Sequence, residues 1–325
     1  MPHPWKLTTR LLLSVYGLLP LALLIVFVDQ VFLYGAIRDY LQLNFRDLAF
    51  ITVILNLPHI VASHVTLFDR DYVTHYKGLL AKAGTLAVAL GTLLPIVFGM
   101  KIFFVFMASY TMYHVLAQQF GLSLMFMSAR PNTDFKGWLW TTTLGYSIGY
   151  LIIYHTYYFT PDQVKIAKLV MLAGFALSGI FALRLMRIVT PEKTPISRWY
   201  FYANIMMGFV CFILFTSGYA FFTVLIPRFV HDLTAFAVYI VHDHNRNEAE
   251  THNYFYMLLD KLHLKPWVAC MPLAIGIAWV LTVGSEHSHA VMYFTFSIIF
   301  LHFIIEGRIW KAGTPHRDSL PIVKN

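Results

Sequence analysis

Charged residues are scarce in this chain. Only 12% of its 325 residues are Asp, Glu, Lys or Arg, whereas 58% are hydrophobic and the mean hydropathy is +0.63. Soluble globular domains carry about 25% charged residues. The composition therefore excludes an ordinary soluble domain and is typical of a protein that crosses a membrane several times.

Cysteine is nearly absent as well. The only two cysteines, Cys211 and Cys270, fall in apolar stretches. They exclude a disulfide framework and leave too few thiolates for an iron–sulfur cluster. The chain also lacks a linker rich in Pro, Gly or Ser, and it lacks a fixed-period repeat. We therefore expect a single multi-pass membrane domain over residues 1–325.

The sequence contains many long apolar runs. Runs of about 20 residues, each long enough to cross a hydrocarbon core of about 30 Å, recur between short polar breaks. They predict an all-α bundle of about ten transmembrane helices, near residues 11–28, 48–68, 79–99, 102–127, 138–159, 166–186, 199–217, 220–242, 267–284 and 289–306.

The polar breaks carry a charge pattern that orients this bundle. Most basic residues, including Arg70, Arg184 and Arg308, fall on the side that an even number of spans assigns to both termini. The positive-inside rule then places both termini in the cytoplasm, and we expect the plasma membrane of a bacterium. The net charge of +8 reflects this topology, and no soluble segment is large enough to present a basic face to a nucleic acid.

Fifteen histidines are unevenly distributed along the chain. A buried imidazole is costly in a membrane, so each one indicates a site or a partner. With a rise of about 1.5 Å per residue, His59, His114 and His231 form one deep layer of the cytoplasmic half of the bilayer. A second layer near the cytoplasmic interface contains the remaining candidates, which are His64, His242, His244, His302 and Glu306.

Helical spacing decides which of these side chains can meet. His59 and His64 are five residues apart and diverge in a regular helix, but Pro58 can kink or widen the turn that carries them. His114 and Gln118 are one turn apart and share a face. The alternatives are polar contacts between helices for His59 and His114, and an interfacial position for His64.

Acidic residues accompany two of the later histidines. Asp232 follows His231 directly and points to another side of the helix, which suits either the orientation of a ligand or an ion pair with Arg228. His302 and Glu306 are one turn apart, a spacing found in helical carboxylate metal sites. His231 and His242 share a face but differ in height by about 16 Å, so one ion cannot bind both.

Several imidazoles at matched depth on separate helices indicate a common metal ion. Neutral imidazole and carboxylate favour iron, copper or zinc. We expect an enzyme, a metal-dependent oxygenase, with His59, His114 and His231 as the deep ligands. His64, His242, His244, His302 and Glu306 would form a second metal position or an orienting shell, and Asp232 and Gln118 would support the ligands. A metal-ion or proton transporter and a haem-binding electron carrier are the alternatives.

The arrangement resembles the histidine-rich integral membrane non-haem iron oxygenases. His59 and His64 in an H-x4-H pattern, His242 and His244 at a helix end, and His302 on a late helix are similar to the scattered boxes of lipid desaturases and hydroxylases. The stretch from Tyr113 and His114 to Phe120 and Gly121 resembles the carotene-cleaving Brp/Blh proteins. The H-x-x-H-H box of desaturases is absent.

This resemblance implies one or two iron ions held by histidines and dioxygen as co-substrate. It also implies a fatty or isoprenoid substrate that reaches the site from the bilayer. A reductant or electron donor would act at the cytoplasmic face.

Overall fold

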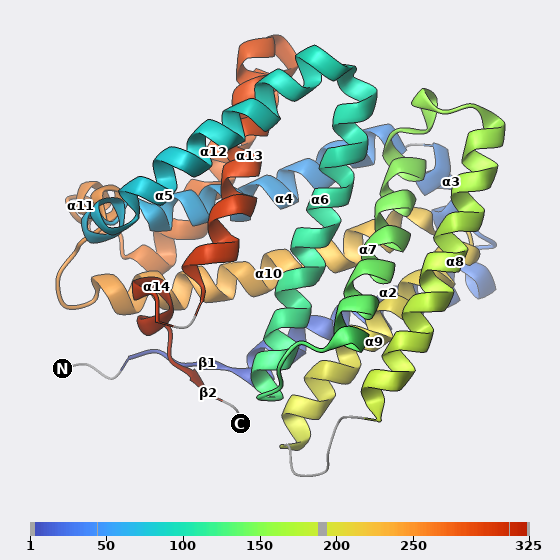
Figure 1. Cartoon of the computed structure of the whole chain (residues 1–325), viewed down its shortest axis with the longest axis horizontal. Helices are drawn as coiled ribbons and strands as arrows, with labels where there is room; N and C mark the ends of the chain where they lie inside the picture. Colours follow the sequence, from blue (N-terminus) through green and yellow to red (C-terminus); the bar gives the residue numbers. More distant parts are fainter. Residues whose placement is uncertain (1–3, 44, 188–193, 312, 324–325) are drawn as a thin grey trace. The chain divides into compact units, whose positions relative to one another are not determined.

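The computed structural model describes residues 4–43, 45–187, 194–311 and 313–323, and these residues are almost entirely helical (Figure 1). Within them, seven helical stretches are long and apolar enough to cross a membrane. The chain is therefore an all-α, multi-pass membrane protein. The count of about ten spans and the cytoplasmic termini remain predictions.

Local signals in the sequence explain where several helices begin. The Asp69 side chain caps α5 by accepting from the amides of Asp71 and Tyr72, and Ser288 caps α13. Thr160 and Gln163 form a capping box at α8, whose first residue is Pro161. Each cap satisfies amides that a helix start leaves without a partner.

Two compact units, interleaved along the chain, make up the structure. Unit 1 comprises residues 1–7, 52–100 and 232–323, and unit 2 comprises residues 8–51, 101–231 and 324–325. Two helices pass from one unit to the other without a break: α4 (Phe45–Leu67) and α10 (Ala220–Asn247). Side chains of α4 are described from Asn56 onward.

Unit 1 is built around the C-terminal half of α4 and the C-terminal half of α10. The other elements are α5 (Arg70–Val88), a π-helical turn η2 (Ala89–Leu93), α11 (Tyr254–Asp260), α12 (Pro266–His287), α13 (His289–Ile309), α14 (Pro315–Asp318), and strand β2 (Ile322–Val323) paired with β1 (Leu7–Thr8). Residues of α4, α10 and α12 share one apolar core, and α5 packs on α13 in another.

One glycine lets η2 approach α13 closely. A Cβ atom added at Gly91 would lie 2.4 Å from the backbone nitrogen of Ser297. Only glycine fits this contact, because real Cβ atoms do not approach backbone so closely. The π-turn of η2 therefore packs directly on the α13 backbone.

Unit 2 contains the remaining helices. These are α1 (Thr9–Ser14), η1 (Val15–Gly17), α2 (Leu18–Phe32), α3 (Ala36–Leu43), α6 (Leu94–Phe126, whose residues 94–100 belong to unit 1), α7 (Thr133–Tyr154), η3 (Thr156–Tyr158), α8 (Pro161–Met186) and α9 (Pro195–Thr216). Figure 1 shows α7 and α8 side by side in green, where Gly145 and Gly174 let the backbones approach. A buried network of polar side chains, in which Gln119 accepts from Tyr16 and Tyr200, ties α6 to η1 and α9.

Long helices coincide with the apolar runs that the sequence indicates. The stretch from Arg70 to Phe126 is assigned as continuous helix but has a non-helical backbone at Gly99, with φ of 79° and ψ of 160°. This residue lies at the polar break between the runs 79–99 and 102–127. The division into two units does not test whether residues 1–325 form one membrane domain, which stays a prediction.

Candidate metal centre

Within unit 1, α4 and α13 bring two buried histidines together. The ring centroids of His59 and His302 lie 4.9 Å apart, and both side chains are 1% exposed. Asp232, on α10, places a carboxylate oxygen 3.0 Å from Nδ1 of His59. Glu306, one turn after His302, places an oxygen 3.6 Å from Nε2 of His302. The pair is thus flanked by two buried carboxylates.

A hydroxyl group fixes the orientation of the His302 ring. The Ser63 hydroxyl donates to the carbonyl of Ile60 at 2.7 Å, and its oxygen lies 2.7 Å from Nδ1 of His302. Because a hydroxyl has one hydrogen to donate, Nδ1 of His302 must donate to Ser63. Nε2 of His302 then keeps its lone pair, which is the state that a metal ligand needs.

Within unit 2, α6 and α10 bring a second pair together. The ring centroids of His114 and His231 lie 5.2 Å apart with the rings at 80° to one another, and both side chains are buried. His231 is bonded in the chain to Asp232, the residue that contacts His59. The uninterrupted helix α10 therefore carries both a member of this pair and the carboxylate that orients His59.

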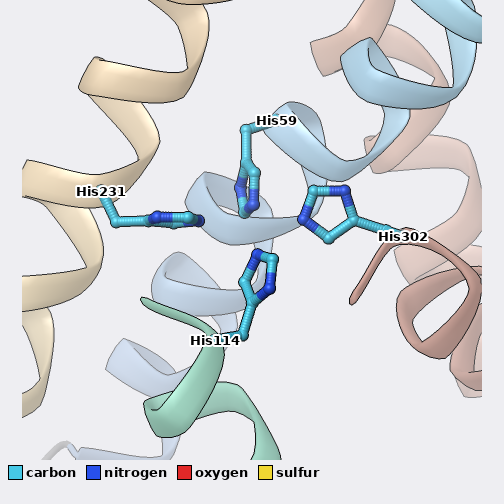
Figure 2. A group of neighbouring side chains, drawn as sticks. All are labelled: His59, His114, His231 and His302. Carbon is cyan, nitrogen blue, oxygen red and sulfur yellow. The ribbon is translucent and has the colours of Figure 1, made fainter. Parts of the chain in front are cut away.

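Four imidazoles converge in this part of the chain. Figure 2 shows the rings of His59, His114, His231 and His302 pointing toward one another from α4, α6, α10 and α13. One ligand nitrogen from each of the four lies within 4.8 Å of the others. Among the described residues this is the group whose His, Cys, Asp and Glu side chains could hold a metal ion.

The spread of these nitrogens suits one ion. Metal–nitrogen bonds of about 2.1 Å separate the nitrogens of a tetrahedral centre by about 3.4 Å and the trans nitrogens of an octahedral centre by about 4.2 Å. The four ligand nitrogens lie within 4.8 Å of one another, so binding of one ion would require the rings to move closer together. Two carboxylates, Asp232 and Glu306, can balance a divalent charge that burial would otherwise penalise.

His302 lies with His59, His114 and His231, the three histidines that the sequence analysis placed in one layer. The apolar run ends at residue 306, but α13 continues to Ile309. His302 therefore lies about 10 Å from the end of its helix, close to the value of about 12 Å for His59 in α4. A count from residue 306, the end of the apolar run, gives a smaller distance for His302 than a count from Ile309, the end of α13.

The other predicted histidine ligands have different neighbours. Nε2 of His64 lies 3.0 Å from the carbonyl of Ile298, and its ring is 6.4 Å from that of His302. Nδ1 of His244 lies 3.1 Å from a Glu248 carboxylate oxygen, and its ring packs on Trp5. The helix around Pro58 remains α-helical, so His59 and His64 diverge as regular geometry requires.

His242 belongs to a separate network. Its Nδ1 lies 2.8 Å from a carboxylate oxygen of Asp243, and its Nε2 lies 2.9 Å from the hydroxyl of Tyr72. Both ring nitrogens are thus engaged by side chains. The sequence predicted a second metal position or an orienting shell here, and the contacts are those of a hydrogen-bonded network.

The predicted supporting residues occupy distinct positions. Asp232 contacts His59, whereas the Arg228 guanidinium lies 5.8 Å from the centre of the Tyr150 ring. Gln118 lies half-buried one turn after His114 on α6. Sequence reasoning missed Ser63, although its position four residues after His59 on the same helix face is a usable signal.

Unit 2 also presents an apolar groove to its surface. The groove has a volume of about 500 Å³ and lies between α7, α8 and α9. Its lining is mostly hydrocarbon and includes Trp138, Phe175, Gly179, Leu183, Gly208 and Phe212. In a membrane such a groove suits an acyl or isoprenoid chain.

Comparison with known proteins adds no relatives, because no family model, no curated protein and no solved structure matches this chain.

Proposed function

We propose that this chain is a membrane-embedded, metal-dependent oxygenase with a single iron ion held by His59, His114, His231 and His302. The observation that carries the proposal is the convergence of four buried imidazoles from four helices. The reaction class, oxidation by dioxygen, is taken from the resemblance of these histidines to the histidine sites of membrane non-haem iron oxygenases. A bound redox-active iron would supply dioxygen activation.

The donor set fits iron, copper or zinc, and the proposed reaction with dioxygen selects iron or copper among them. Neutral imidazoles bind iron, copper and zinc, whereas magnesium and calcium prefer oxygen ligands. Four imidazoles complete a tetrahedral zinc site, which is the closed form typical of structural zinc. A redox-active iron held by the four histidines would supply the dioxygen chemistry that zinc, which has no redox activity, would not. A porphyrin has no room among four rings whose nitrogens lie within 4.8 Å of one another.

The protein side chains have separate tasks in this proposal. Asp232 places a carboxylate oxygen 3.0 Å from Nδ1 of His59 and would help to orient this ring. Ser63 contacts Nδ1 of His302, which would leave Nε2 of His302 for the ion. The burial of all four histidines excludes bulk water from the reacting centre, and the apolar groove of unit 2 is a candidate path for a fatty or isoprenoid substrate.

Elemental analysis of detergent-purified protein tests the proposal. We expect about one iron per chain in the native protein and loss of iron in His59→Ala, His114→Ala, His231→Ala and His302→Ala. His244→Ala serves as the matched control and should retain iron, because its ring packs against Trp5 and Glu248. Retention of iron in all four variants would overturn the ligand assignment. Zinc in place of iron would favour a structural metal site. A haem absorption band would favour an electron carrier, and metal flux in liposomes would favour a transporter.

A second pair of variants tests the role of Asp232. Asp232→Asn should weaken iron binding by about 10- to 100-fold, the usual cost of removing a carboxylate that orients a ligating histidine. Asp243→Asn is matched to it, because Asp243 is equally buried and also contacts a histidine, yet should leave iron binding unchanged. Competition with a chelator measures both affinities. If iron affinity fell equally in the two variants, the loss would be a general effect of a buried amide and Asp232 would have no specific role in iron binding.

A further inference from the structure

Two glycines on facing helices hollow out the apolar groove of unit 2. Gly179 on α8 and Gly208 on α9 both line it. A Cβ atom added at Gly208 would meet no atom within 4 Å, and one added at Gly179 would touch only the Phe209 ring, at 3.8 Å. Larger side chains would therefore fit at both positions. The groove is the space that these missing side chains leave open.

The wall of the groove offers an occupant almost no polar group. Ser178 is the only residue in the lining that carries a hydroxyl group. This hydroxyl lies 2.6 Å from that of Thr142, which donates to the carbonyl of Trp138 at 2.6 Å. Because Thr142 has one hydrogen to donate, Ser178 must donate to Thr142. The groove therefore suits a hydrocarbon chain.

The length of the groove matches one leaflet of a bilayer. Its lining on α8 extends from Leu172 to Leu183, eleven positions or about 16 Å along the helix axis. Half of a hydrocarbon core of about 30 Å is about 15 Å. Both α8 and α9 are long and apolar enough to cross a membrane, so lipid faces the groove. Apolar hollows do not hold water, and a lipid chain can fill this one along its length.

Two arginines lie at a similar height near one end of the groove. The ring centroids of Phe175 on α8 and Phe212 on α9 are 5.9 Å apart, and this contact sets the register of the two antiparallel helices. Arg187 follows Phe175 by twelve residues, and Arg198 precedes Phe212 by fourteen. The two arginines therefore differ in height by only about 3 Å.

Both arginines also lie on the helix faces that line the groove. Arg187 follows Leu183 by four residues, and Arg198 precedes Ile205 by seven, spacings that repeat one face of a helix. Leu183 and Ile205 are part of the lining. Arg187 is exposed and Arg198 is half-buried. An occupant of the groove thus has two guanidinium groups available at this end.

The charge at this end of unit 2 is strongly positive. Residues 128–138, 183–187 and 194–199 form it, and Asp134 is the acidic residue among them. Its carboxylate lies 3.7 Å from the Arg184 guanidinium. The basic residues in the same ranges are Arg130, Lys136, Arg184, Arg187 and Arg198. The positive-inside rule assigns this end to the cytoplasmic leaflet, whose surface carries anionic lipids.

We propose that the groove, with Arg187 and Arg198, is a binding site for an anionic phospholipid. One acyl chain lies in the groove, and the phosphate group lies between the two guanidinium groups, which bind phosphate through paired hydrogen bonds. Basic pockets between membrane helices at the cytoplasmic side bind lipid head groups in this way. The proposal goes beyond the proposed function, and it does not depend on a bound metal.

Native mass spectrometry of the delipidated full-length protein tests the site. Phosphatidylglycerol and phosphatidylcholine with identical acyl chains are added separately, and retained lipid is counted. We expect one phosphatidylglycerol per chain. An arginine near the membrane surface contributes about fivefold to the binding of an anionic lipid, so two arginines should favour phosphatidylglycerol by roughly 25-fold. Equal retention of the two lipids by the native protein would overturn the proposal.

Paired substitutions separate a specific site from general attraction by positive charge. Arg187→Gln combined with Arg198→Gln should reduce the retention of phosphatidylglycerol to that of phosphatidylcholine. Lys165→Gln combined with Lys168→Gln is the matched control, because it removes two exposed positive charges from the opposite end of α8. A preference that survives the arginine changes, or that falls equally with the lysine changes, would contradict the site.

A further variant tests the position of the acyl chain. Gly208→Leu fills the groove, and each methylene group that it displaces should weaken binding about fourfold. Both lipids should therefore bind more weakly by about tenfold or more. Gly276→Leu is the matched control, because Gly276 lies exposed on α12 with no atom within 4 Å of an added Cβ. Unchanged lipid binding in Gly208→Leu would show that the chain does not lie in the groove.

Other occupants give different results in the same experiment. Tighter retention of oleate than of phosphatidylglycerol would replace the phospholipid by a free fatty acid, and a dimer that excludes lipid would replace it by a second copy of the chain. Either result would overturn the proposal.

The lipid site and the proposed function fail separately. Iron is measured in the same preparations. Absence of iron would overturn the proposed function alone, whereas loss of the lipid preference with iron retained would overturn the lipid site alone.

Discussion

Three buried histidines of unit 1 have a polar side chain close to Nδ1 of the ring. His59 has Asp232, His302 has Ser63, and His242 has Asp243. His316 differs, because among the described residues neither of its ring nitrogens has a hydrogen-bond partner although the side chain is fully buried. It stacks on Tyr72 at 3.8 Å between ring centroids. His316 thus contributes packing and remains neutral.

The stability of the protein should therefore depend on pH through His316. Burial, together with the nearby His242, Arg246 and His75, lowers the pKa of His316 to about 2. An unfolded histidine titrates near 6.5. Above pH 6.5 both states are neutral and stability is complete. Below pH 6.5 the unfolded chain binds a proton that the folded chain excludes, so stability falls by up to about 1.4 kcal/mol per pH unit.

Thermal unfolding in detergent at pH 7.5 and pH 5 measures this effect. His316→Phe keeps an aromatic ring for stacking and removes the titration. We expect the native protein to lose about 2 kcal/mol more than the variant between these pH values. An identical pH dependence in both proteins would contradict the prediction and would mean that His316 is protonated in the folded state.

At the scale of elements, close helix packing positions the ligands. α13 carries His302 and is held along one side by α5 and η2. The Gly91 contact allows η2 to press against the α13 backbone at Ser297, which is five residues before His302. Packing of small residues is a principal source of helix association in membranes, where lipid is as apolar as the side chains.

Gly91→Ala should therefore destabilise unit 1. The added methyl group would meet backbone atoms of Ser297 that cannot rotate away, and over-packing of this kind costs about 1 to 3 kcal/mol. Gly84→Ala, in the middle of α5 with no atom within 4 Å of the new methyl group, should be neutral or stabilising by up to about 1 kcal/mol. Thermal unfolding midpoints compare the two variants. A Gly91→Ala midpoint at or above that of Gly84→Ala would argue against close packing of η2 on α13.

At the scale of the whole molecule, seven stretches of the described chain can cross a membrane. Both native cysteines are buried and free, so a single introduced cysteine can report on sidedness. The positive-inside rule assigns the loop before α8 to the outside and the loop after α10 to the cytoplasm. Exposed positions are available at Asp162, in the first turn of α8, and at Ala249, in the loop after α10.

Labelling with a membrane-impermeant maleimide tests the topology. Asp162→Cys should react in intact cells, and Ala249→Cys should react only after the membrane is opened. The native protein should show little labelling in either case, because Cys211 and Cys270 are buried. The opposite pattern would invert the predicted orientation.

Sequence reasoning reached the membrane class and three of the four clustered histidines because both depend on local information. Hydropathy needs only a window of about 20 residues, and depth follows from the rise per residue of a helix. The side chains that contact these histidines could not be predicted from the sequence. Ser63 contacts His302 across 239 positions, and Tyr72 contacts His242 across 170. No local pattern encodes which helices become neighbours.

The amino-acid sequence by itself determined that this chain is a multi-pass membrane protein and predicted that His59, His114 and His231 lie together, because hydropathy and the helical rise act along each segment separately. Tertiary structure alone decided that His302 joins His59, His114 and His231, while His242 joins Asp243 and Tyr72. The physical reason is that ring orientation depends on the packing of separate helices, through contacts such as Gly91 with Ser297.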